Sequence, residues 1–427
     1  MKKQFLLSLL LPATIFAKSF LISSIPVPKT YIQDLDPYPC DEACMQEYID
    51  KEMIFSFLAH ATSKLENPVL DEVRMTHIAL FNLGSATIIG DRLKIALLLP
   101  HKVIGRYAAS TTNASFAYLL ARNHSFELKS YQINAQTPED IQAALEQIQE
   151  EGFYYVIAPL TQEGADIVAD LRPELNIYFP TIHKKSAKST SPFLFYGGID
   201  YRAQSDLLLQ EAVSPLVIFH DNSALGTELT QYEEKTFKFT QPAPAGTIEE
   251  EEEEENAQPV YVEDPSKKVF QFAITNTTTN LESRLKENEE IKAASFFLNT
   301  PIVKSGMVMS QLTLYDTMPT NILSTQINYD PLLLSMTQFE DRKSMIIANS
   351  ITEHNNILIE INSLLGNDII YDWINYTTTV GLDYFYNLIT NENREYDIPL
   401  QENQMLYKIE LLRPSLTRFL HYTSVSK

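Results

Sequence analysis

The sequence has few of the residues on which catalytic and redox proteins depend. Its 427 residues include 12 glycines, two cysteines and one tryptophan. So little glycine argues against an enzyme built on phosphate-cradling loops, and no Gly-Lys-Ser/Thr loop occurs. There is also no His-Glu-x-x-His zinc motif and no Gly-x-Ser-x-Gly nucleophile elbow. We predict a protein with no catalytic residues, metal or cofactor, although a dispersed catalytic triad would leave no motif.

Basic residues are also scarce. The chain has 33 lysines and arginines against 55 acids, a formal net charge of −22, which disfavours nucleic acid and anionic lipid as partners. Seven of the acids form the run Glu249–Glu255, inside a proline-containing segment, 241–264. We expect this segment to be a disordered, solvated loop, because like charges repel. A calcium site is the alternative, but such sites use spaced acids around a tight turn.

Long hydrophobic runs are missing after the N-terminus. Lys2 and Lys3 precede the apolar stretch Phe5–Phe16, and the small residue Ala17 follows it. This order predicts a signal peptide, residues 1–17, cleaved near Ala17, and hence a periplasmic protein. A permanent anchor would need roughly 20 apolar residues without a proline such as Pro12. We expect no membrane-spanning segment in the mature chain.

The two cysteines are Cys40 and Cys44. In an exported protein this spacing predicts one local disulfide that staples the chain. A redox pair would favour two intervening residues rather than three, and a metal site would need further ligands nearby. The staple lies in an N-terminal extension, 18–92, in which a helix is predicted from Asp41, its N-cap, to about Leu65.

From Lys94 onward the pattern alternates between strands and helices. Lys94–Pro100 is continuously apolar, as a strand covered on both faces requires. A helical pattern follows at 106–122, and the same rhythm continues to the end of the chain. Further strands are predicted at 126–134, 154–159, 176–182, 193–199, 216–220, 269–274, 293–298, 321–326 and 407–411. Helices are predicted at 137–152, 163–171, 201–212, 227–234, 303–315, 357–365 and 369–388.

Polar residues follow the carboxyl ends of these strands, where open α/β sheets bind their ligands. We consider as ligand-binding candidates Tyr107, Ser110, Thr161, Thr181, Tyr196 and Asp221. Hydroxyl groups together with free helix N-terminal amides could hold a carboxylate. The alternative for each residue is a structural role as a helix cap or turn former. Acids such as Asp140 and Asp166 fall on predicted helix surfaces, where solvation is the simpler explanation.

Several segments resemble the type I periplasmic binding proteins, two-lobed clamshells that include the Leu/Ile/Val-binding receptors. Lys94–Pro100 with Gly105-Arg-Tyr-Ala108 resembles that family's first strand and loop, and Ile157–Thr161 its third strand and loop. Phe193–Asp200 resembles the crossing into the second lobe, and Ala293–Asn299 a core strand of that lobe. The loop segments are most similar to the branch containing the lipoprotein activator of peptidoglycan synthases.

The resemblance implies two lobes, each a mainly parallel sheet flanked by helices. Lobe 1 would comprise 94–200 plus about 352–415, and lobe 2 would comprise 201–351 with the acidic loop. It also implies a non-catalytic protein that holds a small solute, amino-acid-like or another polar metabolite, between the lobes. Ser110, Thr161 and Thr181 match the family's ligand-hydroxyl positions.

The alternative is an envelope scaffold or regulator that binds a protein partner and has a degenerate cleft. The N-terminal extension, the acidic loop and the missing small-residue run after the third strand favour this alternative.

Overall fold

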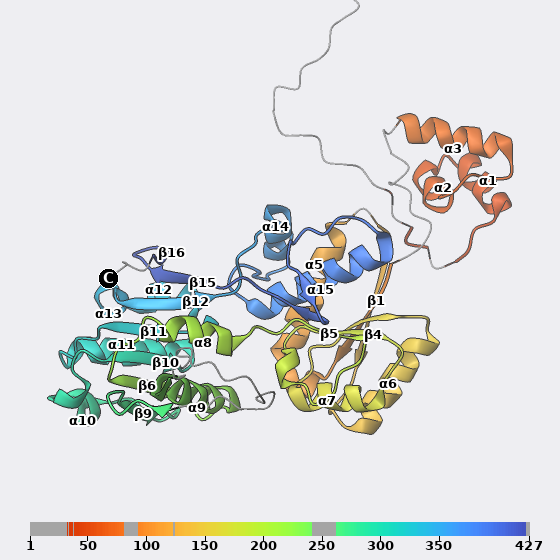
Figure 1. Cartoon of the computed structure of the whole chain (residues 1–427). Helices are drawn as coiled ribbons and strands as arrows, with labels where there is room; N and C mark the ends of the chain where they lie inside the picture. The colour runs from red at the N-terminus through yellow and green to blue at the C-terminus, as the bar shows by residue number, and fades with distance from the viewer. Residues whose placement is uncertain are drawn as a thin grey trace, which may run out of the picture. The chain divides into compact units, whose positions relative to one another are not determined.

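The structure is a computed structural model (Figure 1), and it describes residues 32, 34–36, 38–80, 93–122, 124–240 and 262–423. The predicted signal peptide, its cleavage point and the run Glu249–Glu255 lie outside these residues. The chain divides into two compact units, Met1–Asp91 with Asn123–Ser125 and Arg92–Arg122 with Phe126–Lys427.

The first unit contains α1 (Glu42–Asp50), α2 (Ile54–His60) and α3 (Pro68–Leu80). The prediction of one helix from 41 to 65 is wrong, because the chain turns at Glu52, whose φ is 60°. A residue in this left-handed conformation ends a right-handed helix. The turn lets two short helices pack together, so that Phe57 and Leu58 are fully buried.

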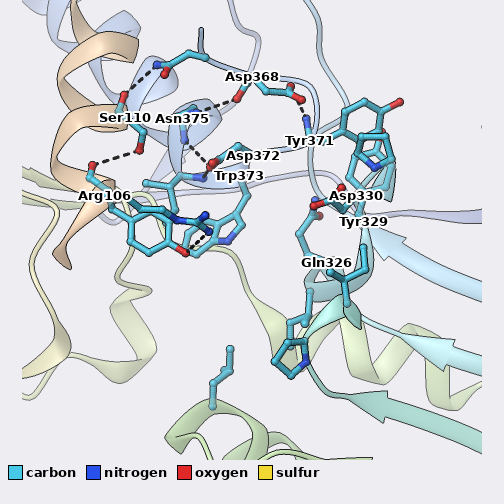
Figure 2. A pocket seen from close by; sticks show the side chains of 18 of the residues that line it. Arg106, Ser110, Gln326, Tyr329, Asp330, Asp368, Tyr371, Asp372, Trp373 and Asn375 are labelled. Atoms are coloured by element: carbon cyan, nitrogen blue, oxygen red, sulfur yellow. Dashed lines mark hydrogen bonds between the residues drawn. The ribbon is translucent and has the colours of Figure 1, made fainter. Parts of the chain in front are cut away.

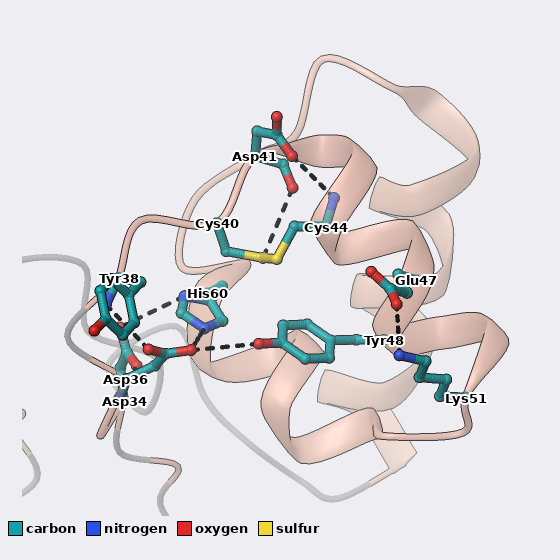
Figure 3. The surroundings of a disulfide bond; sticks show 10 residues. All are labelled: Asp34, Asp36, Tyr38, Cys40, Asp41, Cys44, Glu47, Tyr48, Lys51 and His60. Atoms are coloured by element: carbon teal, nitrogen blue, oxygen red, sulfur yellow. Dashed lines mark hydrogen bonds and ion pairs between the residues drawn. A yellow bond between two sulfur atoms is a disulfide. The ribbon is translucent and has the colours of Figure 1, made fainter.

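The Cys40–Cys44 disulfide is present at the start of α1, as predicted (Figure 3). Asp41 is the N-cap, also as predicted, and its Oδ1 accepts a hydrogen bond from the Cys44 N–H at 2.9 Å. Outside the helices, the segment Asp34–Asp36 lies against His60, which is 3.6 Å from Asp34 and 3.8 Å from Asp36. The disulfide, the cap and the contacts of His60 thus fix the extended chain to the helices of this small unit.

The first sheet of the second unit is parallel except at one edge, where β13 runs antiparallel to β14. Its strands in spatial order are β13 (Leu400–Gln401), β14 (Gln404–Met405), β5 (Leu194–Tyr196), β4 (Asn176–Phe179), β3 (Tyr155–Ile157), β1 (Leu93–Leu99) and β2 (Phe126–Gln132). The helices in this part of the unit are α4 (His101–Ile104), α5 (Arg106–Leu120), α6 (Pro138–Glu150), α7 (Gln162–Leu171), α14 (Asn356–Leu364) and α15 (Trp373–Thr390).

The packing of strand β1 explains why its sequence is apolar throughout. Ile95 and Leu97 belong to the core cluster that includes buried side chains of α5 and α15. Ala96 and Leu98 point to the other face and join the cluster that includes α6 and α7. Successive side chains of a strand face opposite sides, so a sheet covered on both faces needs apolar residues at every position.

The second sheet has the same construction, with β15 and β16 antiparallel at one edge. In spatial order its strands are β16 (Phe419–His421), β15 (Glu410–Pro414), β12 (Met345–Asn349), β11 (Asn321–Ser324), β10 (Ser295–Asn299), β6 (Leu216–His220) and β9 (Val269–Ala273). The accompanying helices are α8 (Tyr201–Leu209), α9 (Ala224–Lys238), α10 (Glu282–Leu285), α11 (Ile302–Leu314), α12 (Leu332–Met336) and α13 (Phe339–Arg342). Short strands β7 (Phe239–Thr240) and β8 (Val262–Glu263) pair with each other.

The predicted fold class, two mainly parallel sheets flanked by helices after an N-terminal helical extension, is confirmed. The limits proposed for the lobes stay a prediction, and β15, which was placed in lobe 1, pairs with β12 of the second sheet. Asp166 is not a solvated surface acid: it is 7% exposed and accepts a hydrogen bond from the Lys188 N–H. Among the described residues, no helix is both long and apolar enough to cross a membrane.

Candidate functional site

A cavity of about 870 Å³ lies where the carboxyl ends of β6, β10 and β11 face the start of α5 and the segment before α15. Figure 2 shows residues from both sides: Arg106, Ser110 and Trp373 on one, Gln326 and Asp330 on the other. The loops that follow parallel strands therefore supply one wall, as is usual for open α/β sheets.

Helix α5 contributes polar side chains from its first two turns. Gly105, with φ of 55°, lets the chain turn between α4 and α5. The Arg106 guanidinium lies over the Tyr107 ring, 5.2 Å from its centroid, and donates a hydrogen bond to the Tyr107 hydroxyl at 3.4 Å. One turn later, the Ser110 hydroxyl donates to the Tyr107 carbonyl oxygen at 3.3 Å. Ser110 and Tyr107 are both half-buried.

The segment before α15 is shaped by two aspartates. Asp368 Oδ1 accepts hydrogen bonds from the N–H groups of Ile370 and Tyr371, at 2.7 and 3.0 Å. Asp372 is the N-cap of α15, and its Oδ1 accepts from Ile374 and Asn375 at 3.0 and 3.2 Å. Both carboxylates therefore use one oxygen to hold the backbone, a usual role for aspartate at helix starts and turns.

Burial raises the pKa of Asp372 above its usual value, and the nearby carboxylate of Asp368 acts in the same direction. The Asp372 hydrogen bonds to the backbone and the positive charge of Arg106 oppose the shift. Trp373 follows and packs edge-on against Tyr201, with ring centroids 6.3 Å apart. This part of the cavity thus combines carboxylates with aromatic rings.

The opposite wall is built from the second sheet. Asp221 follows β6, and its Oδ1 accepts from the Ser223 N–H at 3.1 Å and the Ser223 hydroxyl at 2.5 Å. Asp330 follows β11, and its Oδ1 accepts from the Leu332 N–H at 2.7 Å. Gln326 is 3% exposed, and its Oε1 accepts from the Ser350 N–H at 2.6 Å.

The structure brings only some of the predicted site residues to this cavity. Tyr107, Ser110 and Asp221 line it. Thr161 and Thr181 line a smaller hollow of about 450 Å³, which shares Tyr107 with the larger cavity. Their hydroxyls already have partners: Thr161 caps α7 through the Gly164 N–H, and Thr181 donates to the Leu160 carbonyl at 3.0 Å.

Tyr196 is the outlier of the predicted set. It is 1% exposed, and its ring packs against Phe179 with centroids 5.7 Å apart. Its hydroxyl donates to the Ser189 carbonyl oxygen at 3.4 Å. Tyr196 does not line the larger cavity. Its position at a strand end was read correctly, but side-chain alternation turns it into the core.

Sequence reasoning missed the cavity residues Gln326, Asp330, Asp368, Asp372 and Asn375. The available signal was Asp372 followed by an apolar helical pattern, which is typical of an N-cap. The predicted helix at 369–388 begins too early, because Asp368 and Asp372 each bind the backbone N–H groups that follow them.

The architecture and the cavity together define the type I periplasmic-binding-protein fold. No protein-family model and no curated protein matches the chain. Solved structures that share the fold include the following three. An ABC transporter substrate-binding protein from Sphaerobacter thermophilus is 12% identical, with TM-score 0.56, and covers 78% of this chain and 96% of its own.

A solute-binding protein of an ABC transporter from Rhodopseudomonas palustris, in complex with 3,4-dihydroxybenzoic acid, is 11% identical with TM-score 0.51. The match covers 75% of this chain and 93% of that one. A leucine-binding protein from Thermotoga maritima is also 11% identical, with TM-score 0.50, and covers 78% and 98%. At these identities the likeness establishes the fold alone.

Proposed function

We propose that the chain is a periplasmic, non-catalytic binding protein that holds a small polar solute in the cavity between its two sheets. The observation that carries the proposal is the cavity itself, at the carboxyl ends of three parallel strands. Its volume of about 870 Å³ is within the range typical of small-molecule sites, roughly 300–1,000 Å³. Solved structures with this fold include a protein named as leucine-binding. Another was solved in complex with 3,4-dihydroxybenzoic acid.

Within the proposed site, Tyr107, Ser110 and Asp221 contact the solute. Thr161 and Thr181 belong to the adjoining hollow and would extend the site only for a larger solute. Tyr196 is left out because its side chain is committed to the core. Export, with cleavage near Ala17, is part of the proposal and rests on the sequence of the first 17 residues.

The alternative is a regulator that binds an envelope protein, as in the branch of the peptidoglycan-synthase activator. The solved structures reported above favour solute binding, since those named for an activity are solute-binding or substrate-binding proteins. The protein-binding alternative predicts a cleft that takes up no solute, so one experiment separates the two.

The experiment is a thermal-shift screen of the purified protein against amines, amino acids, aromatic acids, sugars and short peptides. A ligand at 100 times its Kd adds about 2.7 kcal/mol of stability, enough to raise the melting temperature by several degrees. Ser110→Trp should obstruct the cavity and abolish the shift. Ser335→Trp is the matched control, because Ser335 also donates to the carbonyl three residues earlier but is exposed outside the cavity.

A shift that persists in Ser110→Trp and is lost in Thr161→Val/Thr181→Val would place the solute in the smaller hollow. No shift with any class of solute would contradict the proposal. It would favour the protein-binding alternative, which crosslinking in the envelope would then test.

A further inference from the structure

The side chains that line the cavity carry more negative than positive charge. Of the residues that the structure describes, four aspartates, Asp221, Asp330, Asp368 and Asp372, line it together with one cation, Arg106. Arg106 is exposed, and its guanidinium is already engaged with the ring and hydroxyl of Tyr107. A carboxylate solute would therefore meet more negative than positive charge, and like charges in a partly desolvated site repel.

Each of the four aspartates has one oxygen left for a solute. The hydrogen bonds that these aspartates accept from backbone N–H groups, and that Asp221 accepts from the Ser223 hydroxyl, all end on Oδ1. In every case Oδ2 accepts no hydrogen bond from any other described residue, while Oδ1 fixes the orientation of the carboxylate. Such oxygens accept charge-assisted hydrogen bonds from ammonium groups, which are roughly twice as strong as neutral ones.

The second, independent observation is Asn375, which is 2% exposed and lines the cavity. Figure 2 shows it beside Asp368 and Asp372. Its amide nitrogen donates to the Asp368 carbonyl at 3.0 Å, but its Oδ1 has no hydrogen-bond partner among the described residues. A buried carbonyl without a donor costs about 1–3 kcal/mol. A solute N–H group that reached this oxygen would offset that cost, whereas a carboxylate has no donor to offer.

Aromatic rings complete the lining. Tyr329 and Tyr371 pack together with ring centroids 5.0 Å apart, and Trp373 stands against Tyr201. All four rings line the cavity. Aromatic faces attract organic cations within about 6 Å of the ring centroid and also pack against alkyl chains. A hard metal ion such as Mg²⁺ or Ca²⁺ instead requires several oxygen ligands at one point.

The acids lie two on each wall of the cavity. Asp368 and Asp372 precede α15, whereas Asp221 and Asp330 follow strands of the second sheet. Among the described residues, no three acidic, histidine or cysteine side chains come together as a metal site. Separated carboxylates suit a solute with separated positive charges.

We infer, on the basis of the proposed function, that the solute is an organic cation with two or more N–H-bearing ammonium groups, such as an aliphatic diamine. One ammonium group pairs with Asp368 or Asp372 beside Asn375. The other pairs with Asp221 or Asp330 on the opposite wall, and the alkyl chain packs against the aromatic rings. The cavity thus selects a positively charged solute, whereas a carboxylate receptor selects a negatively charged one.

The test is calorimetric titration of the purified full chain with 1,5-diaminopentane, alongside 1,5-pentanediol, glutarate, leucine, 4-hydroxybenzoate and Mg²⁺. The diamine should bind, and the diol and the carboxylates should not. Asp221→Asn, Asp330→Asn and Asp372→Asn keep the local hydrogen bonds, because asparagine retains an acceptor oxygen. Asp372→Asn, and at least one of Asp221→Asn and Asp330→Asn, should weaken diamine binding at least tenfold.

Two aspartates offer matched controls outside the cavity. Asp264 accepts hydrogen bonds from the N–H and hydroxyl of Ser266, just as Asp221 does from Ser223, and Asp41 is a helix N-cap like Asp372. Asp264→Asn and Asp41→Asn should leave diamine affinity unchanged. Melting temperatures of all variants would show whether any loss of binding reflects unfolding.

Four outcomes would overturn the inference. Binding of a carboxylate instead of the diamine would do so while leaving solute binding itself intact. Diamine affinity unchanged in all three cavity variants, or Mg²⁺ binding that depends on the same aspartates without diamine binding, would also refute it. Absence of binding by every solute, in this titration and in the wider screen, would overturn the proposed function as well.

Discussion

Glu233 Oε2 lies 2.6 Å from Nδ2 of Asn299, and both residues are buried. Asn299 ends β10 and lines the cavity, whereas Glu233 is in α9 behind it, where its Oε1 accepts from the Ser205 hydroxyl at 2.9 Å. Burial raises the pKa of Glu233 to about 8, although both hydrogen bonds favour the charged form. A glutamate that is largely protonated near neutral pH therefore supports the wall of the cavity.

Because Glu233 is buried beside Asn299, we expect the free energy of unfolding to depend on pH. The pKa of Glu233 is higher in the folded state, about 8, than the 4.5 of an ordinary glutamate. The folded state therefore binds the proton more tightly, and the contribution of Glu233 to stability is lost as pH rises from about 4.5 through 8. Glu233→Gln removes this titration, so the variant should be more stable than the parent at pH 9, by on the order of 3 kcal/mol.

Urea denaturation at pH 5, 7 and 9 would measure the effect. Glu228→Gln is the control, because Glu228 is on the same helix but 53% exposed in an ion pair with Arg202. Parallel pH profiles for Glu233→Gln and the parent protein would show that Glu233 is not protonated in the folded state.

Asp383 is fully buried at the centre of an ion network between α5 and α15. Its Oδ1 accepts from Arg122 Nη2 at 3.0 Å and from the Tyr118 hydroxyl at 2.9 Å, and its Oδ2 accepts from Arg394 Nε at 3.2 Å. Asp383→Asn keeps the shape but removes the buried negative charge that both arginines contact. We expect the free energy of unfolding to fall by about 3–5 kcal/mol.

The control for Asp383→Asn is Glu340→Gln, which removes an exposed ion pair with Lys343, 2.7 Å long. Exposed pairs contribute about 0–1 kcal/mol. Urea unfolding of both variants at pH 7 gives the comparison. Equal losses in the two variants would mean that burial of the network contributes nothing to its strength.

The strands were predictable where local sequence alone determines them. Lys94–Pro100 and Leu216–His220 are apolar because their sheets are covered on both faces, and both form strands. Met345–Asn349 has the same character and was not recognised, although it is the buried strand β12. The break at Glu52 was missed because the apolar pattern resumes directly after it and nothing local, such as glycine or proline, marks a turn there.

The site was predictable only in part, for a different reason. Ser110 and Asp221, which were predicted because they come after strands in the sequence, both line the cavity, since the carboxyl ends of parallel strands share one edge of a sheet. Asp330 and Asp372 come to the same cavity from segments about 40 residues apart, and only the packing of α15 against α5 and the sheets brings them there. Tyr196 shows the converse error, since a position at a strand end does not say to which face a side chain points.

Two glycines in helix interiors allow a test of packing. A Cβ at Gly381 of α15 would lie 2.2 Å from Cε1 of Tyr178, whose buried ring cannot move away. A Cβ at Gly306 of α11 would lie 2.9 Å from the methyl group of Met336, the end of a flexible side chain. Gly381→Ala should lower stability by about 1–3 kcal/mol or more, despite the better helix propensity of alanine.

Gly306→Ala is the matched control and should be close to neutral. Melting temperatures compare the two variants directly, and near-UV circular dichroism would report displacement of Tyr178. A neutral Gly381→Ala would mean that the ring of Tyr178 has free space that the described structure does not show.

The pH dependence of binding tests the charge assigned to the cavity. A cation is bound by ionised carboxylates, so protonation of Asp372 must weaken diamine binding. Burial and the neighbouring Asp368 raise the pKa of Asp372, while Arg106 lowers it. The affinity for 1,5-diaminopentane should therefore begin to fall, on acidification from pH 7, at a pH above the ordinary aspartate value of 3.8. Calorimetric titrations between pH 7 and 4 measure this fall, which Asp372→Asn should shift to lower pH. An affinity that rises on acidification would show that a neutral or anionic group is being bound.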